Sequence, residues 1–141
     1  MIFQNEIVSL HFEAVKYEFN NAFDTFDRNW LIIKVKLSEG NKVFETMDPF
    51  LQTSELQHMK EWFQTLPNPT YTRLDFIEPN LSFEIIAEKE ETFQIIVRLS
   101  IELNPSWCKE EEYEFCITIT QEDRKNIIRF IEEQHIKFPK R

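Results

Sequence analysis

The chain has 141 residues, 42% of them hydrophobic, and 25 acidic against 16 basic side chains, which gives a formal net charge of −9. A chain of this length and composition is expected to fold as one domain around a single core, and disorder is excluded. The charge argues against a nucleic acid as a direct ligand, because a nucleic-acid-binding protein needs a basic surface, and it suits a basic protein partner.

The ends and the cysteines of the chain indicate where it works. The N-terminal stretch MIFQNEIVSLHFEAVKYEF lacks a basic segment, an apolar core and a small-residue cleavage site, so we expect no signal peptide. No apolar run approaches the ~20 residues of a membrane span. Cys108 and Cys116 form neither a disulfide framework nor a metal-binding spacing. These features predict a cytoplasmic protein without a membrane partner.

Most predicted elements are strands, because apolar and polar residues alternate along much of the chain. In chain order, the alternating segments are residues 9–19, 31–37, 42–47, 73–77, 81–88, 92–103 and 113–119. The clearest is 92–103, in which one face carries Phe93, Ile95, Val97, Leu99, Ile101 and Leu103. Strands with one apolar and one polar face are typical of an antiparallel sheet.

Two segments have helical periodicity instead. The first, residues 54–66, begins with a capping-box pattern of Ser54 and Gln57 and ends at a proline-rich stretch. The second begins with the same pattern in Thr120 and Asp123 and ends before a proline near the C-terminus. Their apolar faces carry Leu56, Met59, Phe63 and Leu66 in the first helix, and Ile127, Ile128 and Ile131 in the second.

The order of strand, turn, strand, capped helix and proline occurs twice, once from Asn29 to Pro67 and once from Thr92 to Pro139. This order suggests two similar halves. The predicted fold is α+β, with one antiparallel sheet of about six or seven strands and both helices packed on its apolar face. We expect it to form a single domain over residues 1–141.

Glycine is almost absent, since Gly40 is the only one. Phosphate-binding loops, dinucleotide fingerprints and nucleophile elbows need several glycines, so these enzyme classes are excluded. Glu55 with His58 and Glu132 with His135 have the ExxH spacing of di-iron helical bundles. Such a site needs two further helices with inward glutamates, so we expect no metal and no other cofactor.

Glutamates crowd two of the predicted turns. One turn carries Glu88, Glu90 and Glu91, and the other carries Glu110, Glu111, Glu112 and Glu114. Strand 92–103 joins the two turns, so they are expected at opposite ends of the sheet, the first beside the start of the last helix. The sequence therefore predicts two separate acidic rims.

Two features near the second acidic turn each have two interpretations. Trp107 lies in a polar turn and is either folded onto the core or offered to a partner as a binding anchor. Glu78 precedes Pro79 and Asn80 between two strand patterns, and it is either a functional carboxylate or part of a bend. We favour the bend, because proline lacks an amide donor and asparagine tolerates turn geometry.

Five short segments form a recognisable set. They are DRNWLIIKVKL (27–37), DPFLQTSELQHMKEWFQTL (48–66), LDFIEPNLSFEI (74–85), LNPSW (103–107) and IKFPKR (136–141). Together they resemble the WapI-family immunity proteins and their uncharacterised bacterial relatives. In those chains an Asn-Trp-Leu strand, a Pro-x-Leu-x-x-x-Glu-Leu helix start, a Phe-x-Glu-Pro-Asn-Leu-x-Phe bend and a C-terminal Phe-Pro-x-Arg recur.

The resemblance implies a non-enzymatic immunity protein. Such a protein occludes the C-terminal domain of a polymorphic toxin, wall-associated or contact-dependent, and in that system the toxin is a nuclease that acts on tRNA. The family supplies no residue roles, so the binding residues are our own inference from the acidic rims. They are Trp107, Glu110, Glu111, Glu112, Glu114, Glu88, Glu90 and Glu91. We expect the partner to be a basic toxin domain, and the protein to be a monomer or a weak homo-oligomer.

Two other functions stay open from the sequence. The first is a general interaction or scaffold domain that self-associates through the solvent-exposed face of the sheet, which would carry Trp30, Ile32 and Ile96. The second is a small hydrolase that uses Glu78 or the glutamates around Glu110. A hydrolase of this kind needs a pair of carboxylates that converge in a cleft.

Overall fold

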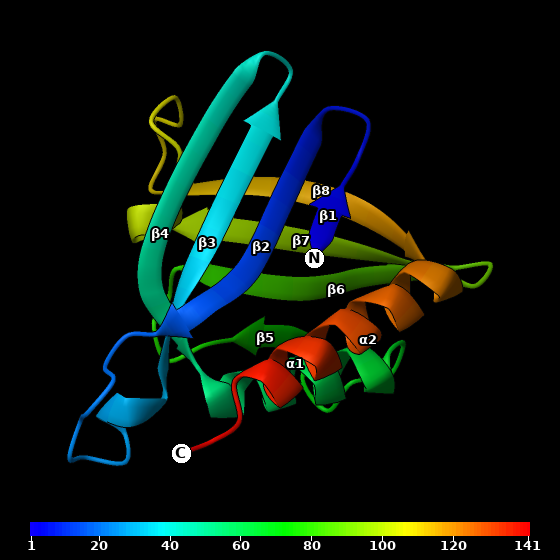
Figure 1. Cartoon of the computed structure of the whole chain (residues 1–141). Helices are drawn as coiled ribbons and strands as arrows, with labels where there is room; N and C mark the ends of the chain where they lie inside the picture. Colours follow the sequence, from blue (N-terminus) through cyan, green and yellow to red (C-terminus); the bar gives the residue numbers. More distant parts are fainter.

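The computed structural model describes the whole chain, residues 1–141, as two antiparallel four-stranded sheets and two α-helices (Figure 1). The first sheet contains β1 (Ile2–Gln4), β2 (Val8–Tyr17), β3 (Trp30–Glu39) and β4 (Lys42–Gln52), and α1 (Thr53–Thr65) follows it. The second contains β5 (Arg73–Asp75), β6 (Leu81–Lys89), β7 (Thr92–Ser100) and β8 (Glu112–Thr120), and α2 (Gln121–Lys137) follows it. Short 3-10 turns at Asp27–Asn29 and Ile101–Leu103 precede β3 and follow β7.

The predicted α+β class and antiparallel pairing are confirmed, but the single sheet of about six or seven strands is wrong, because the chain forms eight strands in two sheets. Alternation shows which face of a strand is apolar. It does not show which strands pair, because two facing sheets bury their inner faces just as one sheet under helices does. Each half of the chain runs through four strands and a helix, so the predicted strand–strand–helix repeat is not confirmed.

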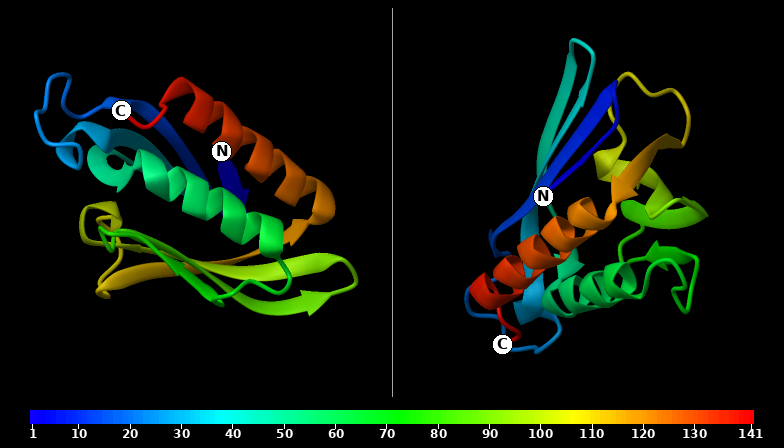
Figure 2. Two further views of the ribbon diagram at one scale, coloured as in Figure 1. Left: turned by 90° about the horizontal axis from the view of Figure 1, so that it is seen from below. Right: turned by 90° about the vertical axis from the view of Figure 1, so that its right-hand side faces the viewer.

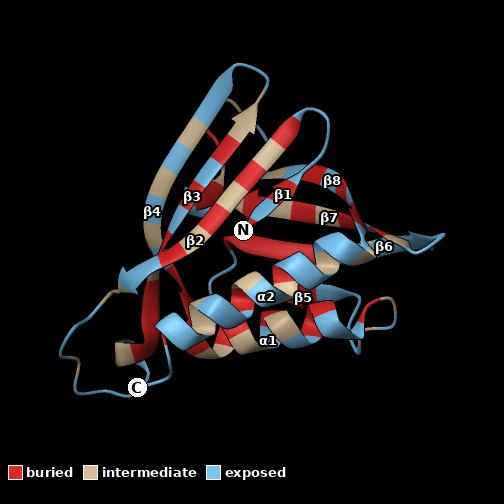
Figure 3. Cartoon of the chain, turned by 45° about the vertical axis from the view of Figure 1, so that its right-hand side comes forward, coloured by how far each residue is buried: buried red, intermediate tan, exposed pale blue.

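The two sheets and the two helices share one core of 32 buried side chains. Phe3 of the first sheet, Phe63 of α1 and Phe83 of the second sheet meet in it. The ring centroids of Phe3 and Phe83 are 4.9 Å apart, and those of Phe63 and Phe83 are 5.7 Å apart. Figure 3 shows buried residues alternating with intermediate or exposed ones along the strands. Burial of these aromatic rings from both sheets and a helix joins the parts of the fold.

The helices lie side by side and close the side of the core that the two sheets leave open (Figures 1 and 2). Their predicted apolar faces are confirmed by the burial of Leu56, Met59, Phe63, Leu66, Ile127 and Ile131, with Ile128 partly buried. The predicted capping box at the start of α2 is confirmed as well. The Thr120 hydroxyl accepts the Asp123 N–H, and the Asp123 carboxylate accepts the Thr120 N–H.

Helix α1 begins differently from the prediction. Its N-cap is Gln52 and its third residue is Glu55, so these two residues form the capping box instead of Ser54 and Gln57. The Glu55 carboxylate accepts the N–H of Gln52 at 2.8 Å and the N–H of Ile77 at 2.6 Å. The sequence pattern was misleading because β4 runs directly into the helix and glutamine is not a preferred N-cap residue.

The predicted strand 92–103 ends early, since β7 stops at Ser100. Ile101 takes a left-handed conformation with a φ of 53°, and its side chain is 56% exposed. Leu103 then returns to the core. The prediction that Ile101 faces inward is wrong, because a local turn resets the direction of the side chains while the apolar pattern of the sequence continues.

Candidate functional site

The register of the second sheet places the two acidic turns at opposite ends, as expected. Thr92 pairs with Thr120, which brings the β6–β7 turn to the start of α2, and Ser100 pairs with Glu112 at the other end. The Ser100 N–H donates to the Asn80 carbonyl at 2.9 Å, so the Glu78–Asn80 bend also lies at that other end. We call exposed Glu88, Glu90 and Glu91 the first acidic end, and exposed Glu110, Glu111 and Glu112 the second acidic end.

At the first acidic end, Glu90 and Glu91 form a two-residue turn between Lys89 and Thr92, which pair with each other. Both glutamates have positive φ, of 48° and 68°. Such turns normally contain Asn-Gly, because a side chain at positive φ costs about 1–2 kcal/mol. The tip of this hairpin therefore presents two carboxylates from a strained turn.

Glu114 differs from the other predicted binding residues because its charge is compensated. Arg98 Nε lies 2.7 Å from the Glu114 carboxylate, and Arg98 Nη1 lies 2.7 Å from the Glu84 carboxylate on the outer face of the second sheet. No glutamate of either acidic end takes part in an ion pair. The uncompensated charge therefore lies at the two ends of the sheet and not around Glu114.

Trp107 is half-buried and packs against the core. Its ring meets the ring of Tyr113 edge-on with centroids 6.5 Å apart, and Lys42 Nζ lies 5.7 Å from the Trp107 centroid. This position fits the first of the two interpretations, a tryptophan folded onto the core. The remaining exposed part of the ring lies near the second acidic end, because Tyr113 directly follows Glu112. Contact between Trp107 and a partner stays a prediction.

A surface that sequence reasoning missed lies between β2 and β3. Residues 18–29, which we call the aromatic loop, expose Phe19 by 43%, Phe23 by 100% and Phe26 by 51%. In Figure 1 the loop projects from the body of the molecule at the lower left. A signal was present in the sequence, because Phe23 and Phe26 follow the end of the alternating segment 9–19 and lie among polar residues, whereas Phe19 was predicted within a strand that ends at Tyr17.

The C-terminal residue holds the aromatic loop in place. The Arg141 guanidinium donates to the carbonyls of Phe19 and Arg28 at 2.6 and 2.5 Å, and it lies 3.7 Å from the ring centroid of Tyr17. The Asn29 side chain accepts the Arg141 N–H at 2.8 Å and donates to the Arg141 carbonyl at 3.1 Å. Both ends of the loop are therefore bound to the end of the chain.

Polar residues of the five segments that carry the family resemblance tie elements together. Asn29 is 3% exposed and accepts the hydroxyl of Thr53, the first residue of α1, at 3.1 Å. Asn80 is 4% exposed and donates to the Glu102 carboxylate at 2.8 Å. Glu55 joins α1 to the bend before β6, a role that exposed Glu78 does not fill. We call Asn29, Glu55, Asn80 and Arg141 the polar junction.

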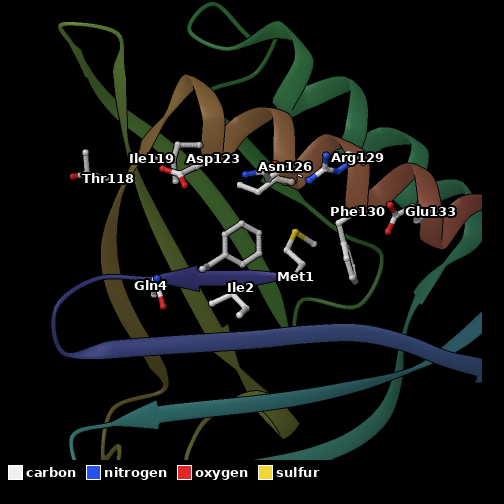
Figure 4. Close-up of a pocket in the computed structure, with 12 residues that line it drawn as sticks. Met1, Ile2, Gln4, Thr118, Ile119, Asp123, Asn126, Arg129, Phe130 and Glu133 are labelled. Atoms are coloured by element: carbon white, nitrogen blue, oxygen red, sulfur yellow. Dashed lines mark hydrogen bonds between the residues drawn. The ribbon is translucent and has the colours of Figure 1, made fainter.

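A cleft of about 730 Å³ lies between β1 and α2 (Figure 4). Met1 and Phe12 exchange both backbone hydrogen bonds at 3.0 Å, so the peptide groups of the next residue, Ile2, point away from β2 toward the free edge. On the opposite wall, the Asp123 carboxylate is bound to the N–H and hydroxyl of Thr120. Glu133 is the only other carboxylate that lines the cleft, so the cleft contains no pair of free converging carboxylates.

A second cleft, of about 1070 Å³, lies between α1 and the segment that leads into β5. His58, Glu61 and Trp62 line it, and Trp62 Nε1 donates to the Tyr71 carbonyl at 2.9 Å. The partner of His58 in its ExxH pair, Glu55, is engaged by backbone N–H groups instead. No group of three or more His, Cys, Asp or Glu side chains is placed to hold a metal ion.

The predicted self-association face bearing Trp30, Ile32 and Ile96 does not exist as one surface. Trp30 and Ile32 belong to β3, and Ile96 belongs to β7 of the other sheet. Trp30 is only 8% exposed, and the Phe26 ring lies against it with centroids 5.6 Å apart. This prediction is wrong because it assumed a single sheet.

Neither helix combines the length and the hydropathy needed to cross a membrane.

Comparisons with known proteins give one match. A comparison with curated proteins found no match, and a comparison with solved structures found none either. The model of the immunity protein WapI-like family matches residues 1–139, which include almost all of the five segments and the strands before them. The resemblance is thus confirmed, and the chain belongs to the immunity protein WapI-like family.

Proposed function

We propose that this protein binds a nuclease toxin domain, whose substrate is tRNA, in a one-to-one complex that covers the nucleic-acid-binding surface of the toxin. Membership of an immunity protein family assigns the chain a toxin-neutralising role in general, and the family match over residues 1–139 is the observation that carries the proposal. The nuclease, its substrate and the mode of inhibition are the proposed part. Inhibition by occlusion needs no reaction at the immunity protein.

The charge of the chain supports a basic nuclease as the partner. A nuclease has to present a basic surface to RNA, and a protein with a net charge of −9 is complementary to it. The uncompensated carboxylates at the two acidic ends extend this attraction beyond direct contact. Because salt screens exposed charges over about 10 Å at 0.1 M, the association rate is expected to fall with ionic strength.

The positions and hydrogen bonds of the carboxylates favour an inhibitor over a hydrolase. Catalysis by paired carboxylates needs two groups that converge in a cleft with separated pKa values. Glu55 is the one acidic residue buried in the fold. Burial raises the pKa of Glu55, and its two carboxylate oxygens each accept a backbone N–H. Its role is therefore to hold α1 against the neighbouring bend.

We assign direct partner contact to Trp107 and the second acidic end, with Glu114, and long-range attraction of the partner to the first acidic end. A standard interface buries about 800 Å² on each partner, which is a small part of the 8071 Å² surface of this chain. The two acidic ends lie at opposite ends of a sheet, so one toxin domain of ordinary size touches one of them. The other end contributes long-range attraction only.

The test uses the cognate toxin domain, which we expect to be encoded immediately upstream of the gene. The purified toxin domain is titrated with this protein while tRNA cleavage is followed. We expect cleavage to fall linearly to zero at one equivalent, and light scattering to show a one-to-one complex. Inhibition at far less than one equivalent would contradict occlusion. If co-expression yields neither a complex nor rescue of growth, the function itself is wrong.

A further inference from the structure

The aromatic loop collects all of the phenylalanines that the fold leaves exposed. Nine of the 14 phenylalanines are buried. Phe19, Phe23 and Phe26 are the only phenylalanines that are exposed. Single exposed apolar side chains are ordinary on a protein surface, whereas a cluster marks an interaction site. Phe23 is fully exposed and contributes nothing to the core, so packing does not explain its presence.

Hydrogen bonds tie the loop to the body of the protein near both of its ends. Arg141 binds the carbonyls of Phe19 and Arg28, near the two ends of the loop, and Asn29 binds the backbone of Arg141. Within the loop, the Asp24 carboxylate accepts the Phe26 N–H at 2.6 Å. An aromatic side chain on a fixed backbone loses little conformational entropy when it is buried by a partner.

The charge of the aromatic loop indicates the chemistry of that partner. Residues 18–29 contain Glu18, Asp24 and Asp27 against Arg28, a net charge of −2, and the Arg141 guanidinium bound at the base of the loop reduces it to −1. None of these three carboxylates is in an ion pair, and Arg28 donates to the Phe23 carbonyl at 2.8 Å. Burial and the nearby Asp27 charge both raise the pKa of Glu18, as expected for a carboxylate without a cationic neighbour.

We propose that the aromatic loop is the apolar anchor of the toxin interface, with Phe23 inserted into an apolar pocket of the toxin that has a basic rim. This inference rests on the proposed function and adds to it a contact site that the acidic ends do not include. Aromatic side chains at the centre of an interface supply much of its binding energy, while charged residues around them steer and orient the partner.

The same charges argue against two other occupants of the loop. A second copy of this chain would bring another negatively charged loop against the first, and like charges at close range repel. An anionic membrane surface would repel the loop for the same reason. A basic protein surface is the partner that the residues around Phe23 fit.

The first experiment compares Phe23→Ala with Ile136→Ala by calorimetric titration of the toxin domain. Ile136 is 79% exposed on α2 and serves as a matched control for the loss of exposed apolar area. We expect Phe23→Ala to weaken binding at least about tenfold, mainly through faster dissociation, and Ile136→Ala to leave binding unchanged. Because Phe23 is fully exposed, the thermal unfolding temperature of the variant is expected to stay at that of the wild type.

The outcomes separate this inference from the proposed function. If the wild type binds and inhibits the toxin while Phe23→Ala binds equally well, the inference is overturned and the proposed function stands. If the wild type fails to bind, the proposed function fails and the inference fails with it. Self-association of the wild type that Phe23→Ala abolishes, or binding to anionic vesicles, would assign the loop to another occupant and overturn the inference.

Two further variants test the chemistry of the pocket. Phe23→Leu keeps an apolar side chain and is expected to bind within about threefold of the wild type. Phe23→Lys places a cation inside the proposed basic rim and is expected to bind more weakly than Phe23→Ala, with a deficit that shrinks as salt rises. Equal affinities of Phe23→Lys and Phe23→Ala at low salt would show that the basic rim is absent.

Discussion

The polar junction meets the aromatic loop at Asn29 and Arg141, and the buried junction residues and the exposed loop phenylalanines have opposite surroundings. Asn29, Glu55 and Asn80 of the polar junction are 3–4% exposed, and each binds backbone or side-chain groups of another element. The aromatic loop directs Phe23 entirely into solvent. One region stabilises the fold and the other is available to a partner.

The five segments that identify the family contain the whole polar junction but only the last three residues, 27–29, of the aromatic loop. Asn29, Glu55, Asn80 and Arg141 are all within them, whereas the segment that begins at residue 27 leaves Phe23 outside. A side chain whose loss leaves buried groups unpaired is constrained by the fold, and an exposed side chain is constrained only by its partner. Recognition of the family therefore identifies mainly the scaffold, and apart from Trp107 the proposed toxin contacts lie outside the five segments.

The largest effect is expected from Glu55→Ala, which removes the acceptor of two backbone N–H groups. The N–H groups of Gln52 and Ile77 would lose their partner in a buried site, and we expect the free energy of unfolding to fall by about 3 kcal/mol. Urea denaturation measures this change. Glu61→Ala, at an exposed position on the same helix, is the control and should change stability by less than about 0.5 kcal/mol. Equal losses of stability in the two variants would show that Glu55 stabilises the fold no more than an exposed surface residue does.

Asn29→Ala sharpens the comparison, because Asn29 belongs to the junction and also ends the aromatic loop. The substitution removes the contacts to Arg141 and Thr53, and we expect a loss of about 2 kcal/mol in unfolding free energy. Hydrogen exchange in residues 18–29 should accelerate as well. Asn126→Ala on the exposed side of α2 is the control and should change neither quantity. If the amides of residues 18–29 exchange hydrogen as slowly in Asn29→Ala as in the wild type, the polar junction does not hold the aromatic loop.

The fold could be predicted from the sequence where one periodicity governs a segment. Leu31, Ile33, Val35 and Leu37 are all buried on one face of β3, as their alternation predicts. Ile101 shows where this reasoning fails, because a backbone turn exposes a residue that continues the pattern. The number of sheets also escaped prediction, since pairing depends on which inner faces meet across the core and not on the pattern of any one strand.

The candidate site could be predicted only where it depends on local order. The opposite positions of the two acidic ends follow from the length of β7 alone. The compensation of Glu114 by Arg98 depends on strand register, which the sequence does not show. The hydrogen bonds of Asn29 to Arg141 join residues 112 positions apart. Such a contact cannot be deduced from residue spacing, so the attachment of the aromatic loop to Arg141 could not be predicted.

Arg141→Ala tests whether the junction serves the aromatic loop. The guanidinium contacts to the Phe19 and Arg28 carbonyls and to the Tyr17 ring are partly solvent-exposed, so we expect a loss of about 1 kcal/mol in stability. Toxin affinity should fall about three- to tenfold, because a loosened loop has to be ordered on binding. Lys140→Ala, one residue earlier and exposed, is the control. A loss of toxin affinity without faster hydrogen exchange in residues 18–29 would assign Arg141 to direct contact with the toxin.

The smallest effect is expected at the first acidic end, where the turn itself is strained. Glu91→Gly relieves the positive φ of 68° but adds backbone entropy to the unfolded chain, so the net gain in stability should be about 0.5 kcal/mol. Glu88→Gly, within β6, should instead destabilise the protein, because glycine weakens a strand. Glu91→Gln keeps the strain and removes the charge, so it should leave stability unchanged and slow toxin association at low salt. If Glu91→Gly and Glu91→Gln slow toxin association equally while only Glu91→Gly gains stability, the strained turn is retained for its charge. If neither substitution slows toxin association, the first acidic end plays no part in attracting the toxin.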